Sequence, residues 1–162
     1  MISVEIKNIK EVLKNKAELE NKLGVKIKIN GKVLSVESEP FNEFEAQRVF
    51  DAISLGFSVE KAIKILDEEI NFIKVRIKDH ANTKNYEVVR SRLIGTHGKT
   101  KKTIQEITKC DVVIHDNIVG IIGPAESTEN ALIAVVNIIK GTKQANAYRY
   151  LERMNAKKRE IK

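Results

Sequence analysis

Apolar residues recur along this chain with two different spacings, and each spacing predicts a different secondary structure. Between residues 126 and 140 they return every third or fourth position and predict one buried face of a helix, formed by Leu132, Val135, Val136 and Ile139. Gly141 ends the pattern, as is typical just past a helix C-terminus. The runs DVVIH (111–115) and IVGII (118–122) are short, continuous and apolar, which favours two strands joined by a turn.

Shorter elements precede these in the second half of the chain. YEVVR (86–90) predicts a strand, residues 91–94 a short turn or helix, and residues 99–108 a helix with its isoleucines on one face. The predicted order is therefore β-α-α-β-β-α. A further basic helix is expected in ANAYRYLERMNAKKREIK, at residues 145–162.

The first half of the chain repeats this plan. VKIKI (25–29) and VLSVE (33–37) predict its later strands, and residues 41–55 its long helix. Sliding the chain against itself by 85 residues aligns apolar positions without a gap, for example Ile27 with Val112. Such a repeat indicates two duplicated small α+β domains. The polar stretch DHANTK (79–84) is the expected linker, so we predict domains at residues 1–80 and 81–162.

Composition limits the class of protein. Of 162 residues, 42% are hydrophobic and 31% charged, which is typical of a folded globular chain. The apolar runs are too short to span a bilayer, and charges interrupt the N-terminal residues, so neither a membrane helix nor a signal peptide is expected. The only cysteine, Cys110, allows no internal disulfide and fits a reducing, cytoplasmic location.

The net charge of +7 lies entirely in the second half. Residues 1–80 carry 14 basic and 14 acidic side chains, whereas residues 81–162 carry 15 basic and 8 acidic. Because a positively charged domain attracts polyanions, we expect nucleic acid to bind the second half. An anionic membrane surface, or solubility alone, would also account for this charge.

The loop IGTHGKTKKT (94–103) carries the candidate chemistry. Its GKT resembles the end of a nucleotide-binding P-loop, but Leu93 stands where such a loop needs its first glycine, which argues against an NTPase. The loop does contain G-x-x-G at residues 95–98. Glycines there permit a tight turn and close approach of a phosphate, and the start of the following helix attracts anions. Lysines after the loop add positive charge.

A G-x-x-G loop inside the order β-α-α-β-β-α resembles the eukaryotic-type (type I) KH domain, whose loop clamps about four nucleotides of a single strand. RLIGTHGKTKKTIQEIT (92–108), IVGIIGP (118–124), YRYLER (148–153) and GFSVEKAIKIL (56–66) further resemble the archaeal and eukaryotic Pno/Dim family of small-subunit pre-rRNA processing factors. This resemblance covers nearly the whole chain. It implies two tandem KH domains with a C-terminal helical extension. The long N-terminal extension of eukaryotic members is missing, which indicates an archaeal protein.

The resemblance also implies the partners and the site. It implies binding to the 3′ region of small-subunit rRNA, beside a Nob-type endonuclease and a translation initiation factor subunit, without a catalytic activity or cofactor of the chain's own. The expected RNA contacts comprise the loop, its basic neighbours and the apolar lining of an adjacent groove: Arg92, Leu93, Ile94, Gly95, Thr96, His97, Gly98, Lys99, Lys101, Lys102, Ile107, Val113 and Ile114. Thr96 and His97 stand where KH loops often carry Lys or Arg, which would weaken the clamp or make it pH-sensitive.

The first half carries no G-x-x-G motif. At the 85-residue offset, the two loop glycines fall on Lys10 and Leu13, and a leucine would block a phosphate. We therefore expect a degenerate KH domain at residues 1–80, used for packing or protein contact. A protein–protein adaptor with vestigial KH domains, or a KH protein of another RNA-processing assembly such as the exosome, are the alternatives. The histidines and Cys110 lack metal-ligand spacing, so no metal site is expected.

Overall fold

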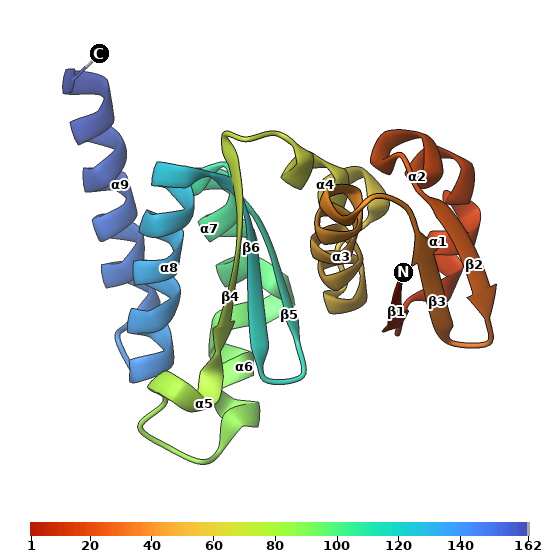
Figure 1. Cartoon of the computed structure of the whole chain (residues 1–162). Coiled ribbons are helices and arrows are strands. Elements are labelled where there is room, and N and C mark those ends of the chain that lie inside the picture. The colour runs from red at the N-terminus through yellow and green to blue at the C-terminus, as the bar shows by residue number, and fades with distance from the viewer. Residues whose placement is uncertain (162) are drawn as a thin grey trace. The chain divides into compact units, whose positions relative to one another are not determined.

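The computed structural model describes residues 1–161 and divides into two compact units, Met1–Glu68 and Glu69–Lys162. Each unit contains one three-stranded antiparallel sheet, with strand order β1-β3-β2 in the first and β4-β6-β5 in the second. Helices complete each unit (Figure 1). The predicted α+β class with two KH-type folds is thereby confirmed. No helix within residues 1–161 has both the length and the apolar character needed to cross a membrane.

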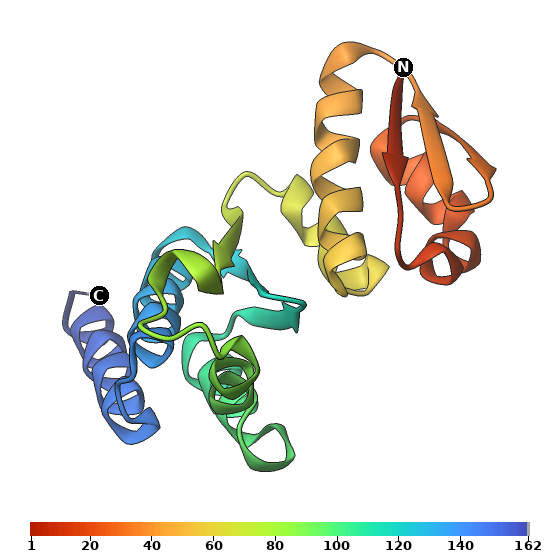
Figure 2. The ribbon, with the colours of Figure 1, turned by 90° about the horizontal axis from the view of Figure 1, so that it is seen from below.

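The N-terminal unit follows the order β-α-α-β-β-α and adds one short helix and a turn. Its elements are β1 (Ile2–Glu5), α1 (Ile9–Lys14), α2 (Lys16–Leu23), β2 (Lys26–Asn30), β3 (Val33–Glu37), α3 (Pro40–Leu55), α4 (Val59–Ile63) and the 3₁₀ turn η1 (Lys64–Leu66). Alternate residues of the strands, such as Leu34 and Val36, are fully buried, and α3 buries Val49, Phe50 and Ile53. Figure 2 shows α3 running alongside these strands.

The C-terminal unit has the same order with two added helices, one directly after its first strand and one after its last helix. Its elements are β4 (Ile70–Arg76), α5 (Ile77–His80), α6 (Tyr86–Ile94), the 3₁₀ turn η2 (Thr96–Gly98), α7 (Lys99–Thr108), β5 (Asp111–His115), β6 (Ile118–Pro124), α8 (Ala125–Lys140) and α9 (Gln144–Ile161). Helices α6, α7 and α8 form one group, and α9 packs on α7 and α8, as both ribbon views show (Figures 1 and 2).

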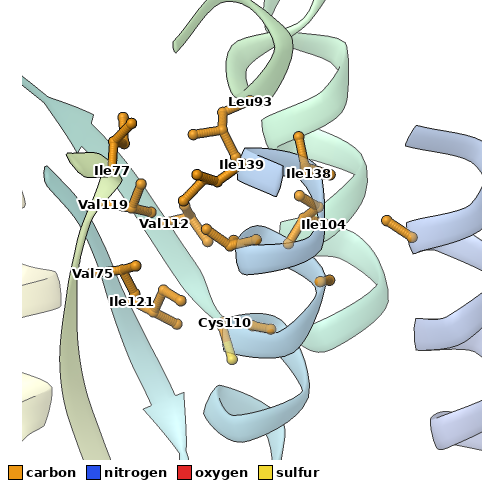
Figure 3. Close-up of a cluster of buried hydrophobic side chains, with 14 of the residues drawn as sticks. Val75, Ile77, Leu93, Ile104, Cys110, Val112, Val119, Ile121, Ile138 and Ile139 are labelled. Atoms are coloured by element: carbon orange, nitrogen blue, oxygen red, sulfur yellow. The ribbon is translucent and has the colours of Figure 1, made fainter. Parts of the chain in front are cut away.

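The core of the C-terminal unit lies between the sheet and these helices (Figure 3). The sheet contributes Val75, Val112, Val119 and Ile121, and the helices contribute Leu93, Ile104, Ile138 and Ile139. Ala147 and Leu151 extend the same core onto α9. The basic C-terminal helix predicted from the sequence is therefore an integral part of this unit, because its apolar face is buried there.

The boundary between the units differs from the predicted one. The predicted boundary followed residue 80, but the C-terminal unit begins at Glu69, because β4 pairs with β6 along its whole length from Ile70 to Arg76. The segment 79–84 is therefore no linker between units and instead leads from α5 to α6. Because the boundary lies after residue 68 and not after residue 80, the C-terminal unit also has a larger positive charge than predicted. Residues 1–68 carry 11 basic and 12 acidic side chains, and residues 69–162 carry 18 and 10, net charges of −1 and +8.

The strand predicted at residues 86–90 is wrong. Tyr86–Ile94 is helix α6, and its N-cap residue Asn85 accepts a hydrogen bond from the backbone N–H of Val88. The two valines favoured a strand locally, but Val89 and Leu93 lie four positions apart and are both buried on one helix face. The first strand of the unit is β4, which lies sixteen residues earlier in the chain, counted from Ile70 to Tyr86.

The 85-residue repeat holds only for the later elements. It places Lys16–Leu23 within Lys99–Thr108, Lys26–Asn30 on Asp111–His115 and Pro40–Leu55 on Ala125–Lys140. It fails for the first strand and first helix, because the C-terminal unit has extra residues between them. Lys10 and Leu13 therefore lie inside α1 rather than at a loop. The N-terminal equivalent of the G-x-x-G turn is the single residue Asn15, which joins α1 to α2 with φ −116°. The first unit does lack the glycine loop.

Candidate nucleic-acid interface

The G-x-x-G segment reverses the chain between α6 and α7. Gly95 has φ 78° and ψ 172°, and Gly98 has φ 75° and ψ 13°. Between them, His97 adopts a left-handed conformation with φ 55°. Thr96 and His97 are exposed at the tip of the turn. The backbone N–H of Gly98 donates to the carbonyl oxygen of Gly95 at 3.1 Å, which closes the turn.

The two glycines of the loop have different physical roles. A β-carbon at Gly95 would lie 2.6 Å from the backbone nitrogen of Thr100, so this glycine lets the turn pack against the start of α7. A β-carbon at Gly98 would have no heavy atom within 4 Å. The space beside Gly98 is open, and the absence of a side chain there leaves the backbone at the start of α7 accessible to a ligand.

The start of α7 is suited to an anion. Gly98 is its N-cap and offers no side-chain cap, so the first N–H groups of the helix lack the usual side-chain acceptor. Lys99 and Lys102 are exposed and Lys101 is half-buried. Within residues 1–161, none of the three lysines forms an ion pair. The lysine side chains and the positive end of the α7 dipole therefore both favour an anion at the start of α7.

A hydrogen bond shows which side of α7 faces the sheet edge. Gln105 Oε1 accepts from the backbone N–H of Val112 on β5 at 2.9 Å. Lys101 lies one turn earlier on the same face of the helix. Because backbone groups alternate in direction along an antiparallel strand, the N–H and C=O of Ile114 point to the same open edge as those of Val112. The face of α7 with Lys101 and Gln105 therefore lies next to the open edge of β5, and this surface is the candidate for the groove expected from the sequence.

Helix α6 provides the other wall. The guanidinium of Arg90 donates through Nη1 to Oδ1 of Asn117 in the β5–β6 turn. Ile94 lies four residues later on the same helix face, and 38% of its surface is exposed. The groove thus runs past Arg90 and Ile94 on one side and Lys101 and Gln105 on the other.

Two residues predicted to bind RNA have structural roles. Arg92 donates through Nη1 to the carbonyl oxygen of Ile138 at 3.0 Å and through Nη2 to that of Thr142 at 2.8 Å. It thereby satisfies carbonyls at the C-terminal end of α8. Leu93 is 1% exposed in the core, so its side chain cannot reach a base.

The apolar residues predicted to line the groove do not all lie beside it. Ile107 lies two positions beyond Gln105, about 200° around the helix, and faces α9, where Asn155 Nδ2 donates to its carbonyl oxygen at 2.8 Å. Val113 points to the sheet face opposite buried Val112, away from the helices. Ile114 packs partly against the core, and its backbone lies at the groove. Of the apolar residues predicted to line the groove, Ile94 has an exposed side chain beside it.

Sequence reasoning missed Arg90, Gln105 and Asn117. No motif singles them out, because each becomes part of the groove only through a contact with a distant element. A helical wheel of residues 86–94 places Arg90 beside Ile94, but Val88 and Val89 favour a strand in the sequence alone. Within the described residues, no three His, Cys, Asp or Glu side chains gather as they would around a metal ion.

Comparison with known proteins identifies the fold of the second unit. The family model for the second KH domain of PNO1 proteins, described as a eukaryotic type KH domain (KH-domain type I), matches residues 69–156. The match begins at the residue where the second compact unit begins. It ends inside α9, so the family pattern includes most of this helix.

Relatives come from archaea and eukaryotes. A KH domain-containing protein of Methanocaldococcus jannaschii is 31% identical over 149 residues, which are 88% of this chain and 66% of that protein. The RNA-binding protein pno1 of Drosophila melanogaster is 33% identical over 100 residues, 60% of this chain and 42% of the relative. The chain thus spans less than two thirds of the length of these relatives.

Solved structures extend the likeness to both units. Dim2p from Pyrococcus horikoshii has a TM-score of 0.82 and 28% sequence identity, covering 94% of this chain and 98% of that one. A complex of a/eIF2alpha, aDim2p and rRNA from the same organism has a TM-score of 0.82 at 27% identity, covering 94% and 92%. The two-unit architecture is therefore shared with a protein whose solved complex contains rRNA.

Proposed function

This chain belongs to the PNO1 family of eukaryotic-type (type I) KH domains, and we propose that it binds single-stranded RNA during maturation of the small ribosomal subunit. The observation that carries the proposal is the open backbone at Gly98. It stands at the start of α7 with no side chain in the way and with three unpaired lysines around it. The proposed role is binding rather than catalysis, in the cytoplasm.

The loop would hold the sugar–phosphate backbone. The backbone N–H of Lys99 already donates to the carbonyl oxygen of Thr96. A phosphate beside Gly98 would therefore be held by the positive end of the α7 dipole and by Lys99 and Lys102, whose side chains approach from solvent. The net charge of +8 on residues 69–162 attracts the strand from a distance. Thr96 and His97 at the tip are polar contacts, so the clamp relies mainly on the backbone and the flanking lysines.

The groove would read the bases. The backbone N–H and C=O of Ile114 at the open edge of β5 match the donor and acceptor pattern of a base edge, and Ile94 offers an apolar surface for a base face. Arg90 is held by Asn117 at the groove wall with further N–H groups available. Recognition would therefore combine stacking with hydrogen bonds to unpaired bases.

The proposed RNA and partners follow from relatives. A relative in Emericella nidulans is named a pre-rRNA-processing protein, and the archaeal complex joins Dim2p to rRNA and an initiation factor subunit. We propose the 3′ region of small-subunit rRNA as the ligand, with an initiation factor subunit and a Nob-type endonuclease as partners. The N-terminal unit would provide protein contact, because it lacks the glycine loop and exposes Phe41 (73%) and Phe44 (61%) one turn apart on α3.

A salt titration tests RNA binding directly. For single strands the logarithm of the binding constant falls with the logarithm of salt concentration by about 0.7 per phosphate neutralised, so three lysines predict a slope of about −2. Lys99→Ala and Lys102→Ala should each reduce that slope by about 0.7. Lys78→Ala, an exposed lysine on α5, is the matched control and should leave it unchanged. A flat salt dependence, or equal losses in all three variants, would contradict the proposed contacts and favour an adaptor.

A further inference from the structure

A second hollow lies behind the G-x-x-G loop. Its lining on α6 consists of Glu87, Val88, Ser91 and Arg92 and does not include Arg90 or Ile94. Its volume is about 560 Å³, and it is bounded by the outer face of α6, the start of α7 and the start of α9. Gly95, Thr96 and Lys99 form its rim on the side of the loop. The hollow is therefore continuous with the proposed phosphate contact but separate from the groove along β5.

The walls of the hollow suit a flat, partly apolar group. Val88 lines it from α6 and is 48% exposed, an unusual position for an aliphatic side chain next to a polar loop. Tyr148 lines it from α9, with its ring half-buried against the core of the unit. A nucleobase has apolar faces that pack on such side chains and a polar edge that needs partners.

Polar groups are also available to meet a base edge. Ser91 and Gln144 lie in the lining, and Gln144 is held in place because its Nε2 donates to the carbonyl oxygen of Arg92 at 3.4 Å. Glu87 places a carboxylate in the same lining. A carboxylate accepts hydrogen bonds from the exocyclic amino groups of a base, and Arg92 and Lys99 in the same lining are donors for its carbonyl oxygens and ring nitrogens.

We propose that this hollow holds one base of the bound RNA strand, flanking the nucleotides in the groove, between Val88 and Tyr148. The inference rests on the proposed RNA-binding function and extends its footprint beyond the groove. The strand that places a phosphate at Gly98 passes the rim formed by Thr96 and Lys99, so the next nucleotide reaches the hollow. Helix α9 then contributes directly to RNA binding through Tyr148.

The test compares RNA lengths on the full chain. The probes are a four-nucleotide segment of the 3′-terminal small-subunit rRNA and six-nucleotide versions extended at the 5′ or the 3′ side. The unaltered protein should bind one of the two extended probes, either the 5′ or the 3′ version, more tightly than the four-nucleotide probe. Val88→Ser and Tyr148→Leu should each reduce that gain at least about fivefold, since stacking of a base is worth about 1–3 kcal/mol. Both changes are neutral in charge, so affinity for the four-nucleotide probe should change less than twofold.

Ile133→Ser provides the matched control, because Ile133 is 44% exposed on α8 and does not line the hollow. It should leave both affinities unchanged. A gain from extension that survives Val88→Ser and Tyr148→Leu, or no gain from either extension, would overturn the proposed base site while leaving groove binding intact. No binding of the four-nucleotide probe would instead reject the proposed function itself. Photo-crosslinking from a 4-thiouridine at the added position should label the peptide containing Tyr148.

Discussion

Gly95 faces Thr100 so closely that a β-carbon on Gly95 would lie 2.6 Å from the backbone nitrogen of Thr100. This relationship separates the two glycines of the loop. Gly95→Ala should destabilise the C-terminal unit, because the methyl group meets backbone and the residue also has a positive φ. Gly98→Ala meets no neighbour, and its left-handed conformation costs about 1–2 kcal/mol.

Urea unfolding of both variants checks this difference. We expect a clearly larger loss of unfolding free energy for Gly95→Ala than for Gly98→Ala. The RNA affinity of folded Gly98→Ala should be lower than that of the unaltered protein, because its methyl group lies where the phosphate approaches. Equal stability of the two variants would contradict the distinct packing of the glycines.

Two carboxylates at the tip of the loop should abolish most RNA binding. Thr96 and His97 are exposed, and aspartate is tolerated in the left-handed conformation of residue 97, so Thr96→Asp with His97→Asp should fold normally. Repulsion of phosphates should lower affinity for single-stranded RNA at least tenfold, about 1.4 kcal/mol. Asn146→Asp with Ala156→Asp adds the same charge at exposed positions of α9 and is the control for net charge. An unchanged affinity in the loop variant would remove the loop from the mechanism.

The two arginines of α6 should behave differently when replaced. Arg92→Met removes two hydrogen bonds to the carbonyl oxygens of Ile138 and Thr142, and bonds from a charged donor contribute about 1.5–3 kcal/mol each. We expect lower stability, and a smaller loss of RNA affinity in the folded protein than for Arg90→Met when the probe is the four-nucleotide RNA that fills only the groove. Arg90→Met should mainly reduce RNA affinity, because Arg90 lies at the groove. Thermal unfolding together with RNA titration distinguishes the two effects, and the reverse pattern would refute the assignment.

Cys110 should be unreactive in the folded protein. It is 3% exposed, and burial raises the pKa of its thiol, although the nearby Thr108 and Lys158 oppose this shift. A raised pKa keeps the thiol neutral, so the associated stability is present below the ordinary thiol pKa and is lost as pH rises through the raised value. A thiol reagent at pH 8 should react slowly with native protein and rapidly after unfolding. Fast reaction of the native protein would contradict the burial of Cys110.

The domain boundary predicts which fragments fold. Residues 69–162 contain β4, which pairs with β6, and should fold and retain most of the RNA affinity. Residues 81–162 lack this strand and should fail to give a cooperative unfolding transition. Residues 1–68, with a net charge of −1 and no glycine loop, should bind RNA far more weakly than 69–162 at the same salt. Comparable binding by residues 1–68 would contradict this division.

The sequence by itself determined the class of fold and the chemistry of the loop. The spacing of apolar residues predicted β2, β3, α3 and their counterparts β5, β6 and α8, because strand and helix periods show directly which positions are buried. The G-x-x-G motif and the charge imbalance are local or additive properties, so both can be identified in the sequence without knowledge of the fold. The KH fold, predicted from the G-x-x-G motif within the order β-α-α-β-β-α, is confirmed.

Tertiary structure decided the remainder. Residues 86–90 contain strand-favouring valines, yet they form a helix because β4 already occupies the place beside β6 and α6 must bury Val89 and Leu93. Likewise, Arg92 and Arg90 are equivalent in the sequence, but one is held by the end of α8 and the other by Asn117. Such assignments depend on which distant segment meets each helix face, and a single sequence does not contain that geometry.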